Sequence, residues 1–296
     1  MIASRKQCIL HAHLAALLFG GTALFAKLIE LPAEVITFWR TVVAVVSVVI
    51  LCRIRRQSLR LAHQRDMWMQ IGIGCILGLH WGTYFAAIQL SSVAIGITAL
   101  YVSPVLSVLI EAAIHKVWPD VIDLLLGVVV FIGVLFLAPD LSWKNEFTQG
   151  VLLGVVSAFF LAMRQILHTR SRVRSASGMT LLFYQLLGVG ALFAYFGFNT
   201  DFEAVQGNVG YLLILGSIFT ALPHFLNLSA LRVLGARSVL IISSLMVPYS
   251  MVFSALLLDE MPNTKLLIGC ALVMGAATIE NFRTSSAKVS LSSKMT

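Results

Sequence analysis

The sequence predicts an all-α integral membrane protein with ten transmembrane helices in two inverted five-helix repeats. Three observations support this fold class. Of 296 residues, 59% are hydrophobic and 11% are charged, and the mean hydropathy is +0.92. A soluble domain holds roughly 45–50% apolar residues, because it needs a charged exterior. The apolar residues also form runs of membrane-spanning length, and two of these runs contain a proline in similar surroundings.

Ten runs reach the roughly 17–25 residues that a transmembrane helix needs. The first run continues past the length of a signal-peptide core and has no clear small-residue cleavage site, so we interpret it as a genuine span. The polar, serine-rich tail 284–296 is predicted to be disordered and cytoplasmic. The ten runs lie at about 9–29, 34–52, 67–89, 92–114, 121–139, 148–168, 178–198, 207–230, 236–258 and 264–282.

Positive charges orient these spans. With a cytoplasmic N-terminus, most of the 21 Lys and Arg residues fall in cytoplasmic segments, whereas the opposite loops hold Lys144 and Lys265 among several acidic residues. The positive-inside rule therefore predicts cytoplasmic N- and C-termini in a multi-pass protein of the plasma membrane, the inner membrane of a bacterium. The net charge of +8 arises from these loops and does not indicate nucleic-acid binding. The four cysteines lack paired or metal-ligand spacing, so no disulfide framework, metal or cofactor is expected.

The two prolines indicate an internal repeat. Pro104 in LYVSPVLS and Pro248 in SLMVPYSM are 144 residues apart, and the same offset aligns His80 with His224. Because each copy has an odd number of spans, the second copy must cross the membrane in the opposite sense, as in many secondary transporters. A proline in mid-span removes a backbone hydrogen bond and bends its helix. Both prolines are therefore expected near the midplane, where such folds bind their cargo.

Longer segments carry a family resemblance. The first half contains LLFGGTALFAKL and YFAAIQLSSVAIGITALYVSPVLSVLIEAAI, and the second contains NLSALRVLGARSVLIISSLMVPYSMVFSALLLDEMP. Over nearly its whole length, the chain resembles the ten-helix EamA-type carriers of the drug/metabolite transporter superfamily. The resemblance implies two EamA-like repeats, expected at 1–140 and 147–283. It also implies movement of small organic solutes or amino acids, usually outward, by proton coupling or as a facilitator. No substrate-specific signature is matched.

Arg40 is a charge deep in an apolar run, and a charge at bilayer depth is costly unless it is paired or wet. It lies about seven residues, roughly 10 Å, into the second span. At a slightly different repeat offset, it aligns with Gln185. Arg40 either pairs with Glu30 or Glu34 across the first loop, or faces a central cavity and attracts an anionic group such as a carboxylate.

Other polar and aromatic residues in the spans also leave two interpretations open. His80 and His224 are either satisfied packing residues or a pair that exchanges protons, with a proton as the coupling ion. Arg164 either snorkels to the inner surface or forms a polar set with Gln165, Gln185 and Asn227. Aromatic side chains are candidates for the cavity wall, although helix packing is the commoner role of each alone. The predicted substrate-binding or pathway residues are Trp39, Arg40, His80, Trp81, Tyr84, Tyr101, Pro104, Arg164, Gln185, His224, Asn227, Pro248 and Tyr249.

The predicted function is a secondary transporter or facilitator for a small organic metabolite, an amino acid or related solute. It is expected to work by alternating access around a midplane cavity, in the direction of export. A lipid or lipid-linked-sugar flippase is the alternative, since a laterally open cavity needs few sequence changes. A membrane enzyme is disfavoured because HExxH, GxSxG and phosphate-cradling glycine motifs are missing, so no catalytic residue is expected. The glycine-bearing fifth and tenth spans predict close helix contact at the periphery or in a homodimer.

Overall fold

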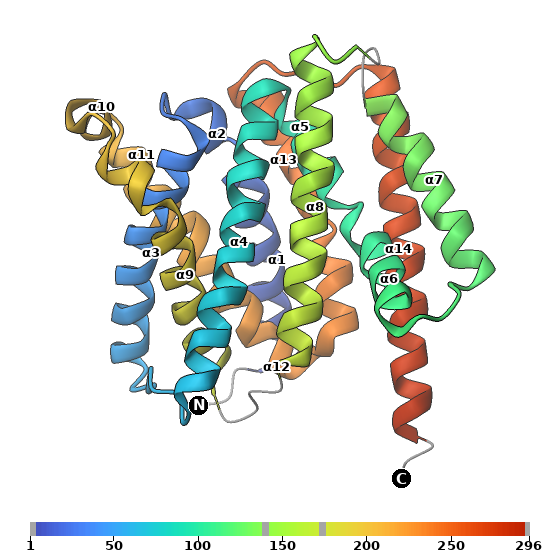
Figure 1. The fold of residues 1–296 in the computed structure, drawn as a ribbon, viewed down its shortest axis with the longest axis horizontal. Coiled ribbons are helices and arrows are strands. Elements are labelled where there is room, and N and C mark those ends of the chain that lie inside the picture. The colour runs from blue at the N-terminus through green and yellow to red at the C-terminus, as the bar shows by residue number, and fades with distance from the viewer. Residues whose placement is uncertain (1–3, 138–141, 172–175, 294–296) are drawn as a thin grey trace.

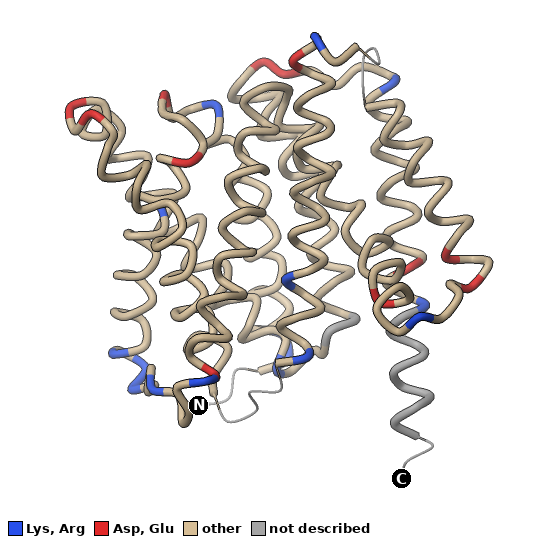
Figure 2. The backbone as a smooth tube through the Cα atoms, viewed as in Figure 1, with Lys and Arg blue, Asp and Glu red and all other residues tan. Residues whose placement is uncertain are grey.

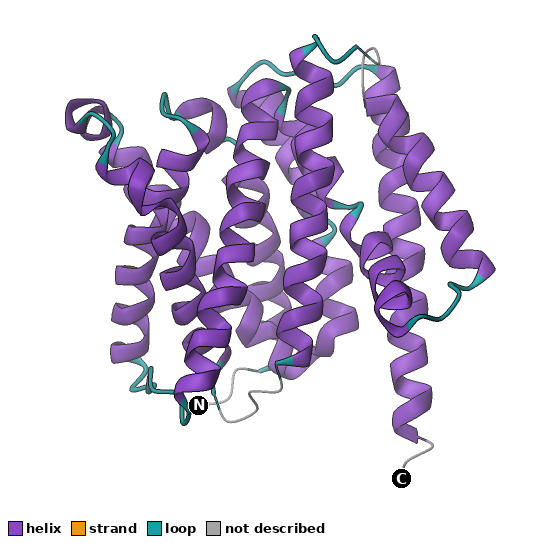
Figure 3. Cartoon of the chain, viewed as in Figure 1, coloured by secondary structure: helices purple, strands orange, loops and turns teal. Residues whose placement is uncertain are grey.

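Every regular element in residues 4–137, 142–171 and 176–293, the ranges described by this computed structural model, is a helix (Figure 1, Figure 3). Within them, nine stretches are long and apolar enough to cross a membrane, and α7 is a shorter apolar helix of 17 residues. At 1.5 Å per residue, α7 is about 25 Å long, near the lower limit for a span. The predicted all-helical membrane fold is therefore confirmed. The elements are α1 (Arg5–Thr22), α2 (Phe25–Leu28), α3 (Ala33–Ile54), α4 (Gln64–Leu90), α5 (Val93–Leu100), α6 (Ser103–His115), α7 (Val121–Leu137), α8 (Glu146–Arg170), α9 (Gly178–Phe198), α10 (Phe202–Gly207), α11 (Val209–Gly216), η1 (Ser217–Ala221), α12 (Leu222–Ser243), α13 (Met246–Leu257) and α14 (Thr264–Ser293).

The helix packing has the symmetry expected of two inverted repeats. Helix α4 of the first half packs on α8, just as α12 of the second half packs on α1. The contact of α4 with α9 corresponds to the contact of α11 and η1 with α3. The contact of α5 and α6 with α8 corresponds to the contact of α13 with α1. The pairs α3–α9, α5–α13 and α7–α14 each join equivalent spans. Exchanging the two halves therefore reproduces these pairings, whereas, among the described residues, the packing of α14 on α5 and α6 has no counterpart of similar extent between α7 and α13. The bounds 1–140 and 147–283 stay a prediction.

Both repeat-related prolines follow an interruption of their helix. The fourth span breaks between α5 and α6, and Pro104 lies in the first turn of α6. The ninth span breaks between α12 and α13, and Pro248 lies in the first turn of α13. A first-turn N–H has no acceptor inside its own helix, so proline is tolerated there without loss of a hydrogen bond. The two prolines thus mark where each span restarts.

The eighth span contains two irregularities that the sequence patterns did not predict. A π-helical turn, η1, separates α11 from α12, and within it the Thr220 hydroxyl donates to the carbonyl oxygen of Leu215 at 2.7 Å. The Thr22 hydroxyl at the end of α1 donates to the Phe219 carbonyl oxygen at 2.9 Å, which ties the first span to this turn. Further along, Gly235 adopts φ 76° and ψ 167°, a conformation that favours glycine, and divides the eighth span from the ninth.

Helices α7 and α14 form a pair at one edge of the bundle (Figure 1). They approach closely at Gly133 and Gly269, where a Cβ on Gly269 would lie 2.8 Å from the Gly133 carbonyl oxygen. Arg283 of α14 also pairs with Asp120, just before α7, at 2.9 Å and with Asp123 in the first turn of α7. The close contact expected of the fifth and tenth spans is therefore made within the chain.

The terminal face, as we call it, is the end of the bundle where α1 begins and where Arg283 lies. Most Lys and Arg residues gather there (Figure 2). From this face α14 continues as a helix to Ser293, into the segment 284–296 that was predicted to be disordered. Side chains beyond Arg283 and the whole of residues 294–296 lie outside the described part, so disorder of the tail stays a prediction.

The crossing of α4 and α9 yields the first testable prediction. A Cβ on Gly74 would overlap the carbonyl of Gln185 in α9, whereas nothing lies within 4 Å of a Cβ on Gly72, half a turn away. The substitution Gly74→Ala is expected to destabilise the protein by roughly 1–3 kcal/mol through overpacking. The matched control Gly72→Ala is expected to be neutral or stabilising by up to about 1 kcal/mol. Unfolding of the detergent-solubilised variants measures both, and equal stability would contradict the described crossing.

Candidate functional site

A cavity of about 370 Å³ lies between helices of both repeats. Its volume falls within the roughly 300–1,000 Å³ of small-molecule sites. Glu111, Gln165 and Thr169 line it and are exposed in the last two turns of α6 and α8, so the cavity opens toward the terminal face. Leu100 and Tyr101 lie at its deep end. The other lining residues are Ser103, Pro104, Ser107, Val108, Leu161, Ile166, Leu240, Ser243, Met246, Glu280 and Asn281.

A buried apolar cluster closes the opposite side of the bundle. Leu100 belongs to both structures: it lines the deep end of the cavity and packs inside this cluster. Other members come from α2, α3 and α4, near the ends remote from the terminal face, and include Phe25, Ile36, Phe85 and Ile88. The described cavity therefore has an entrance on one face and an apolar seal beyond its deep end.

One hydrogen bond joins the two interrupted spans at the deep end of the cavity. The Tyr101 hydroxyl donates to the Ser243 carbonyl oxygen at 2.9 Å. Tyr101 is the C-cap residue of α5, and Ser243 is the last residue of α12, so the bond connects the break in the fourth span to the break in the ninth. Predicted residues Tyr101 and Pro104 thus lie on the cavity wall. Pro248 is exposed and is not part of that wall, and neither is Tyr249, which packs against Gly20 of α1.

Arg40 is buried in the bundle, with 2% of its surface exposed. Its guanidinium carbon lies 3.9 Å from the centroid of the Trp81 ring and 4.8 Å from that of Phe85. Desolvated cation–π contacts of this kind contribute about 2 kcal/mol or more, which offsets part of the cost of burying the charge. Within the described ranges Arg40 forms no ion pair, so the pairing with Glu30 or Glu34 is not formed.

Several buried polar atoms of Arg40, of the preceding residue Trp39 and of Tyr84 in α4 find no hydrogen-bond partner among the described residues. They are Nε and Nη1 of Arg40 itself, Oη of Tyr84 and Nε1 of Trp39. Buried polar groups in proteins are nearly always hydrogen-bonded, so a concentration of unpartnered ones needs an explanation. All four atoms are donors, since a guanidinium and an indole N–H cannot accept and a phenol donates readily.

The two repeat-related histidines are fixed in different ways. His80 in α4 is held by Ser157 in α8: the serine hydroxyl donates to the His80 carbonyl oxygen at 2.8 Å, and Nδ1 of His80 donates to the same hydroxyl at 2.8 Å. His224 in α12 makes ring contacts instead, with Phe19 at 5.0 Å and with Trp81 at 6.3 Å between centroids. Both histidines therefore have packing partners, and their predicted role in the pathway is untested.

Gln185 in α9 is the centre of a buried hydrogen-bond network, which we call the amide network. Its Oε1 accepts from Nε and Nη2 of Arg164 at 3.1 and 2.7 Å. Its Nε2 donates to Oε1 of Gln70 at 2.8 Å and to Nδ1 of His168 at 3.0 Å. Because Gln185 is fully buried, these bonds satisfy its amide and hold the Arg164 charge beside a carbonyl oxygen. The predicted association of Arg164 with Gln185 is present in this geometry.

Gln70 and His168 belong to the amide network, yet the sequence patterns did not single them out. Gln70 opens a helical stripe of α4 with a spacing of three and four residues, and that stripe continues through two predicted pathway residues. This periodicity is the signal that identifies Gln70. Gln165 lies on the cavity wall instead, and Asn227 has a buried Oδ1 without a partner in the described ranges. The buried stripe is Gln70, Gly74, Leu77, Trp81, Tyr84 and Ile88.

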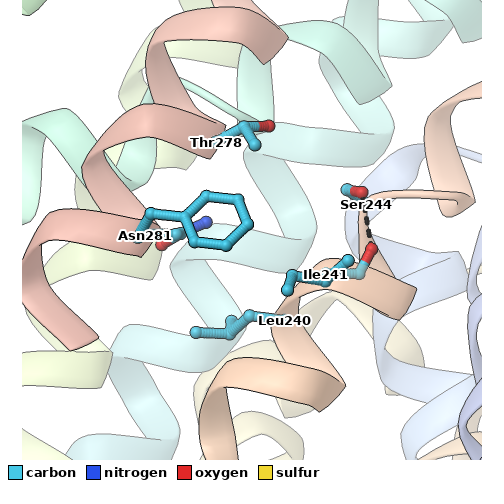
Figure 4. A pocket seen from close by; sticks show the side chains of 6 residues that line it. Leu240, Ile241, Ser244, Thr278 and Asn281 are labelled. Carbon is cyan, nitrogen blue, oxygen red and sulfur yellow. Dashed lines mark hydrogen bonds between the residues drawn. The ribbon is translucent and has the colours of Figure 1, made fainter. Parts of the chain in front are cut away.

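A second pocket lies between the end of α12 and α14, lined by Leu240, Ile241, Ser244, Thr278, Asn281 and Phe282 (Figure 4). The Ser244 hydroxyl donates to the Ile241 carbonyl oxygen at 2.7 Å. The volume of this pocket is about 30 Å³, room for about one or two water molecules. It is too small for a metabolite. The 370 Å³ cavity is the candidate site, because it is large enough and is lined by both repeats.

Comparisons with known proteins agree with this architecture. A family model described as "EamA-like transporter family" matches residues 6–138 and 148–281. An uncharacterized transporter, YxxF of Bacillus subtilis, is 23% identical over 80% of this chain and 78% of its own length. An uncharacterized transporter of Archaeoglobus fulgidus is 28% identical over 72% of this chain and 73% of its own. A solved crystal structure, 20% identical, aligns over 94% of this chain and 98% of its own with a TM-score of 0.61, which shows a shared fold.

The amide network predicts a strong coupling between two side chains. The substitution Gln185→Leu is expected to destabilise the protein by roughly 1.5–3 kcal/mol, because Arg164 loses a charge-assisted acceptor. Adding Arg164→Met is expected to cost less than the sum of the single changes, by about 0.5–3 kcal/mol. Thermal unfolding in detergent measures this cycle. Gln165→Leu, one residue along and exposed, is the control with little effect, and strict additivity of the two changes would refute the coupling.

The cavity predicts sided access to Ser107. In a background without the four native cysteines, Ser107→Cys is expected to react with a membrane-impermeant maleimide applied to the terminal face, because Ser107 lines the open cavity. Val105→Cys on the same helix is the control, since Val105 is 3% exposed and is expected to stay unlabelled. Labelling of right-side-out and inside-out vesicles gives the readout. Stronger reaction from the opposite face would contradict the described opening.

Proposed function

As a member of the EamA-like transporter family, this chain is a multi-pass membrane transporter, and we propose that it moves a small organic metabolite by alternating access. The proposed cargo is an amino acid or a related solute, and the proposed site is the 370 Å³ cavity between the repeats. The observation that carries the proposal is the one-sidedness of this cavity. It opens at the terminal face and ends at Leu100, which also belongs to the apolar seal.

Alternating access needs elements that change angle without losing internal hydrogen bonds. The breaks in the fourth and ninth spans, at equivalent positions in the two repeats, are suited to this, because the backbone there is already interrupted. The Tyr101–Ser243 hydrogen bond crosses between those breaks, and its rearrangement accompanies the proposed rocking of one half against the other. A carrier of this kind needs a contact that has two alternative arrangements, and a cavity that is exposed to each side of the membrane in turn.

The proposed orientation follows from charge. Most Lys and Arg residues lie at the terminal face (Figure 2), which under the positive-inside rule supports a cytoplasmic location for this face, in a protein proposed to lie in the plasma membrane. The cavity then loads from the cytoplasm, which supports export as the direction of transport. Proton coupling through His80 and His224 has weaker support, because both side chains have packing partners.

Reconstitution into proteoliposomes tests this proposal. A panel of amino acids and nucleoside-like solutes is expected to include at least one with saturable flux. Ser107→Trp fills the cavity and is expected to reduce that flux at least about tenfold by excluding the solute. Val128→Trp on the exposed face of α7 is the control and is expected to retain flux. Absence of flux for every solute would refute a soluble-metabolite carrier, and movement of labelled lipids between leaflets would indicate a flippase instead.

A further inference from the structure

We propose that the transported solute carries a carboxylate and that Arg40 and Tyr84 bind this group. The inference rests on the proposed carrier function and specifies the class of its substrate. It is carried by the geometry around one buried guanidinium, whose surroundings supply hydrogen-bond donors and aromatic faces but no counter-charge within the described residues.

The donors around Arg40 suit a carboxylate. Nε and Nη1 of Arg40 and Oη of Tyr84 have no partner in the described chain, and the two residues are 2% and 5% exposed. The two residues lie in one neighbourhood, because the Tyr84 ring is 5.9 Å from the Phe85 ring between centroids, and the Arg40 guanidinium lies over Phe85. In a guanidinium, Nη2 forms a planar fork with either Nε or Nη1, and each of these forks matches the two oxygens of a carboxylate. A phenol hydroxyl beside it adds a third donor.

In the second repeat a buried arginine has an oxygen acceptor from the chain, which Arg40 does not have among the described residues. Gln185, the residue that aligns with Arg40, gives its Oε1 to the guanidinium of Arg164 at 2.7 and 3.1 Å. A buried guanidinium in this protein therefore has an oxygen acceptor where the chain provides one. Around Arg40 the aromatic faces of Trp81 and Phe85 are present, but an acceptor from the described residues is not. A solute oxygen would complete the set.

The positive charge inside the bundle also favours an anionic solute. The guanidinium groups of Arg40 and Arg164 both lie inside the bundle, and neither forms an ion pair with a described residue. The carboxylates on the cavity wall, Glu111 and Glu280, lie close to the terminal face, and Glu280 already contacts Arg283 at 3.4 Å. An incoming anion therefore supplies the negative charge that the protein does not place beside Arg40. Because Arg164 is engaged by Gln185, a single guanidinium remains, which favours a monocarboxylate over a doubly charged phosphate.

The deep end of the cavity adjoins the surroundings of Arg40. Tyr101 packs against the buried cluster that contains Tyr84 and Phe85, and the Arg40 guanidinium lies over the Phe85 ring. Tyr101 is also the residue whose hydroxyl reaches Ser243 across the two breaks. A solute that moves past Tyr101 when this bond rearranges would meet the donors of Tyr84 and Arg40 next. Binding of the carboxylate and closure of the cavity behind it are then coupled steps of one cycle.

Matched ligands test the inference on the unmodified protein. The probes are three carboxylates and their primary amides: L-leucine and L-leucinamide, hexanoate and hexanamide, benzoate and benzamide. The unfolding midpoint of the purified, detergent-solubilised chain is measured against ligand concentration, since a ligand of the folded state raises it. At least one carboxylate is expected to raise the midpoint, with its amide at least about tenfold weaker. Equal effects of acid and amide, or no effect of any carboxylate, would overturn the inference.

Variants then assign the effect to the proposed residues. Arg40→Gln is expected to weaken the carboxylate by about 10–100-fold, Arg40→Lys by less because it keeps the charge, and Tyr84→Phe by a few-fold through loss of one donor. Arg53→Gln, at the exposed end of the same helix, is the matched control and is expected to keep full affinity. Unchanged affinity in Arg40→Gln would overturn the assignment. If that variant does not fold, Arg40→Lys and Tyr84→Phe give the same decision.

Flux measurements separate failure of this inference from failure of the carrier function. Saturable flux of neutral or cationic solutes alone would overturn the carboxylate subsite and leave a transporter. Carboxylate binding that depends on Arg40, without flux of any solute, would support the subsite and refute the proposed transport. Flux of a carboxylate that Arg40→Gln slows and Arg53→Gln does not would support both.

Discussion

The hydrocarbon interior of a bilayer offers no hydrogen-bond partner, and this constraint governs where the chain can bend. Every interruption inside a span must be satisfied by the protein itself. The π-helical turn in the eighth span is accompanied by two threonine bonds, from Thr220 to Leu215 and from Thr22 to Phe219. The breaks of the fourth and ninth spans face each other and share the bond from Tyr101 to the carbonyl oxygen of the last residue of α12. Bending is therefore concentrated in the interior between the repeats, where a carrier needs it.

The same constraint applies to charge, and the protein meets it in several ways. Lys27 reaches the carbonyl oxygens of Gln89 and Ser91 at 3.2 and 3.0 Å. Arg164 uses a side-chain amide, and Arg283 uses carboxylates at the terminal face. Arg40 differs, because aromatic faces are its described partners and two of its donors remain unpartnered. Such an arrangement leaves part of the desolvation cost of the charge uncompensated by the described residues. This incomplete compensation marks Arg40 as a binding residue in our interpretation.

Symmetry and asymmetry have separate consequences in this fold. The main helix pairings repeat when the halves are exchanged, a symmetry that suits the alternating access proposed here. The side chains do not repeat. Gln185 is the repeat equivalent of Arg40 but carries no charge, and Pro104 lines the cavity whereas Pro248 does not. In the proposed cycle, backbone symmetry provides the movement, and the difference between the halves provides a polar site of defined charge.

Composition and run length by themselves determined that this chain is a helical membrane protein, and the paired prolines determined that it is a repeat. These properties depend on the solvent and on chain length, which a sequence states directly. The rotation of each helix about its axis was decided only in the tertiary structure. Lipid-facing and interior-facing side chains are both apolar, so amphipathic periodicity gives little information about which face is buried. That rotation depends on close approaches between distant residues, such as Gly74 against the backbone of Gln185. For this reason the sequence identified Arg164, Gln185 and Tyr101 as candidates, but only the packed bundle joined Gln70 and His168 to the amide network and separated Tyr249 from the cavity.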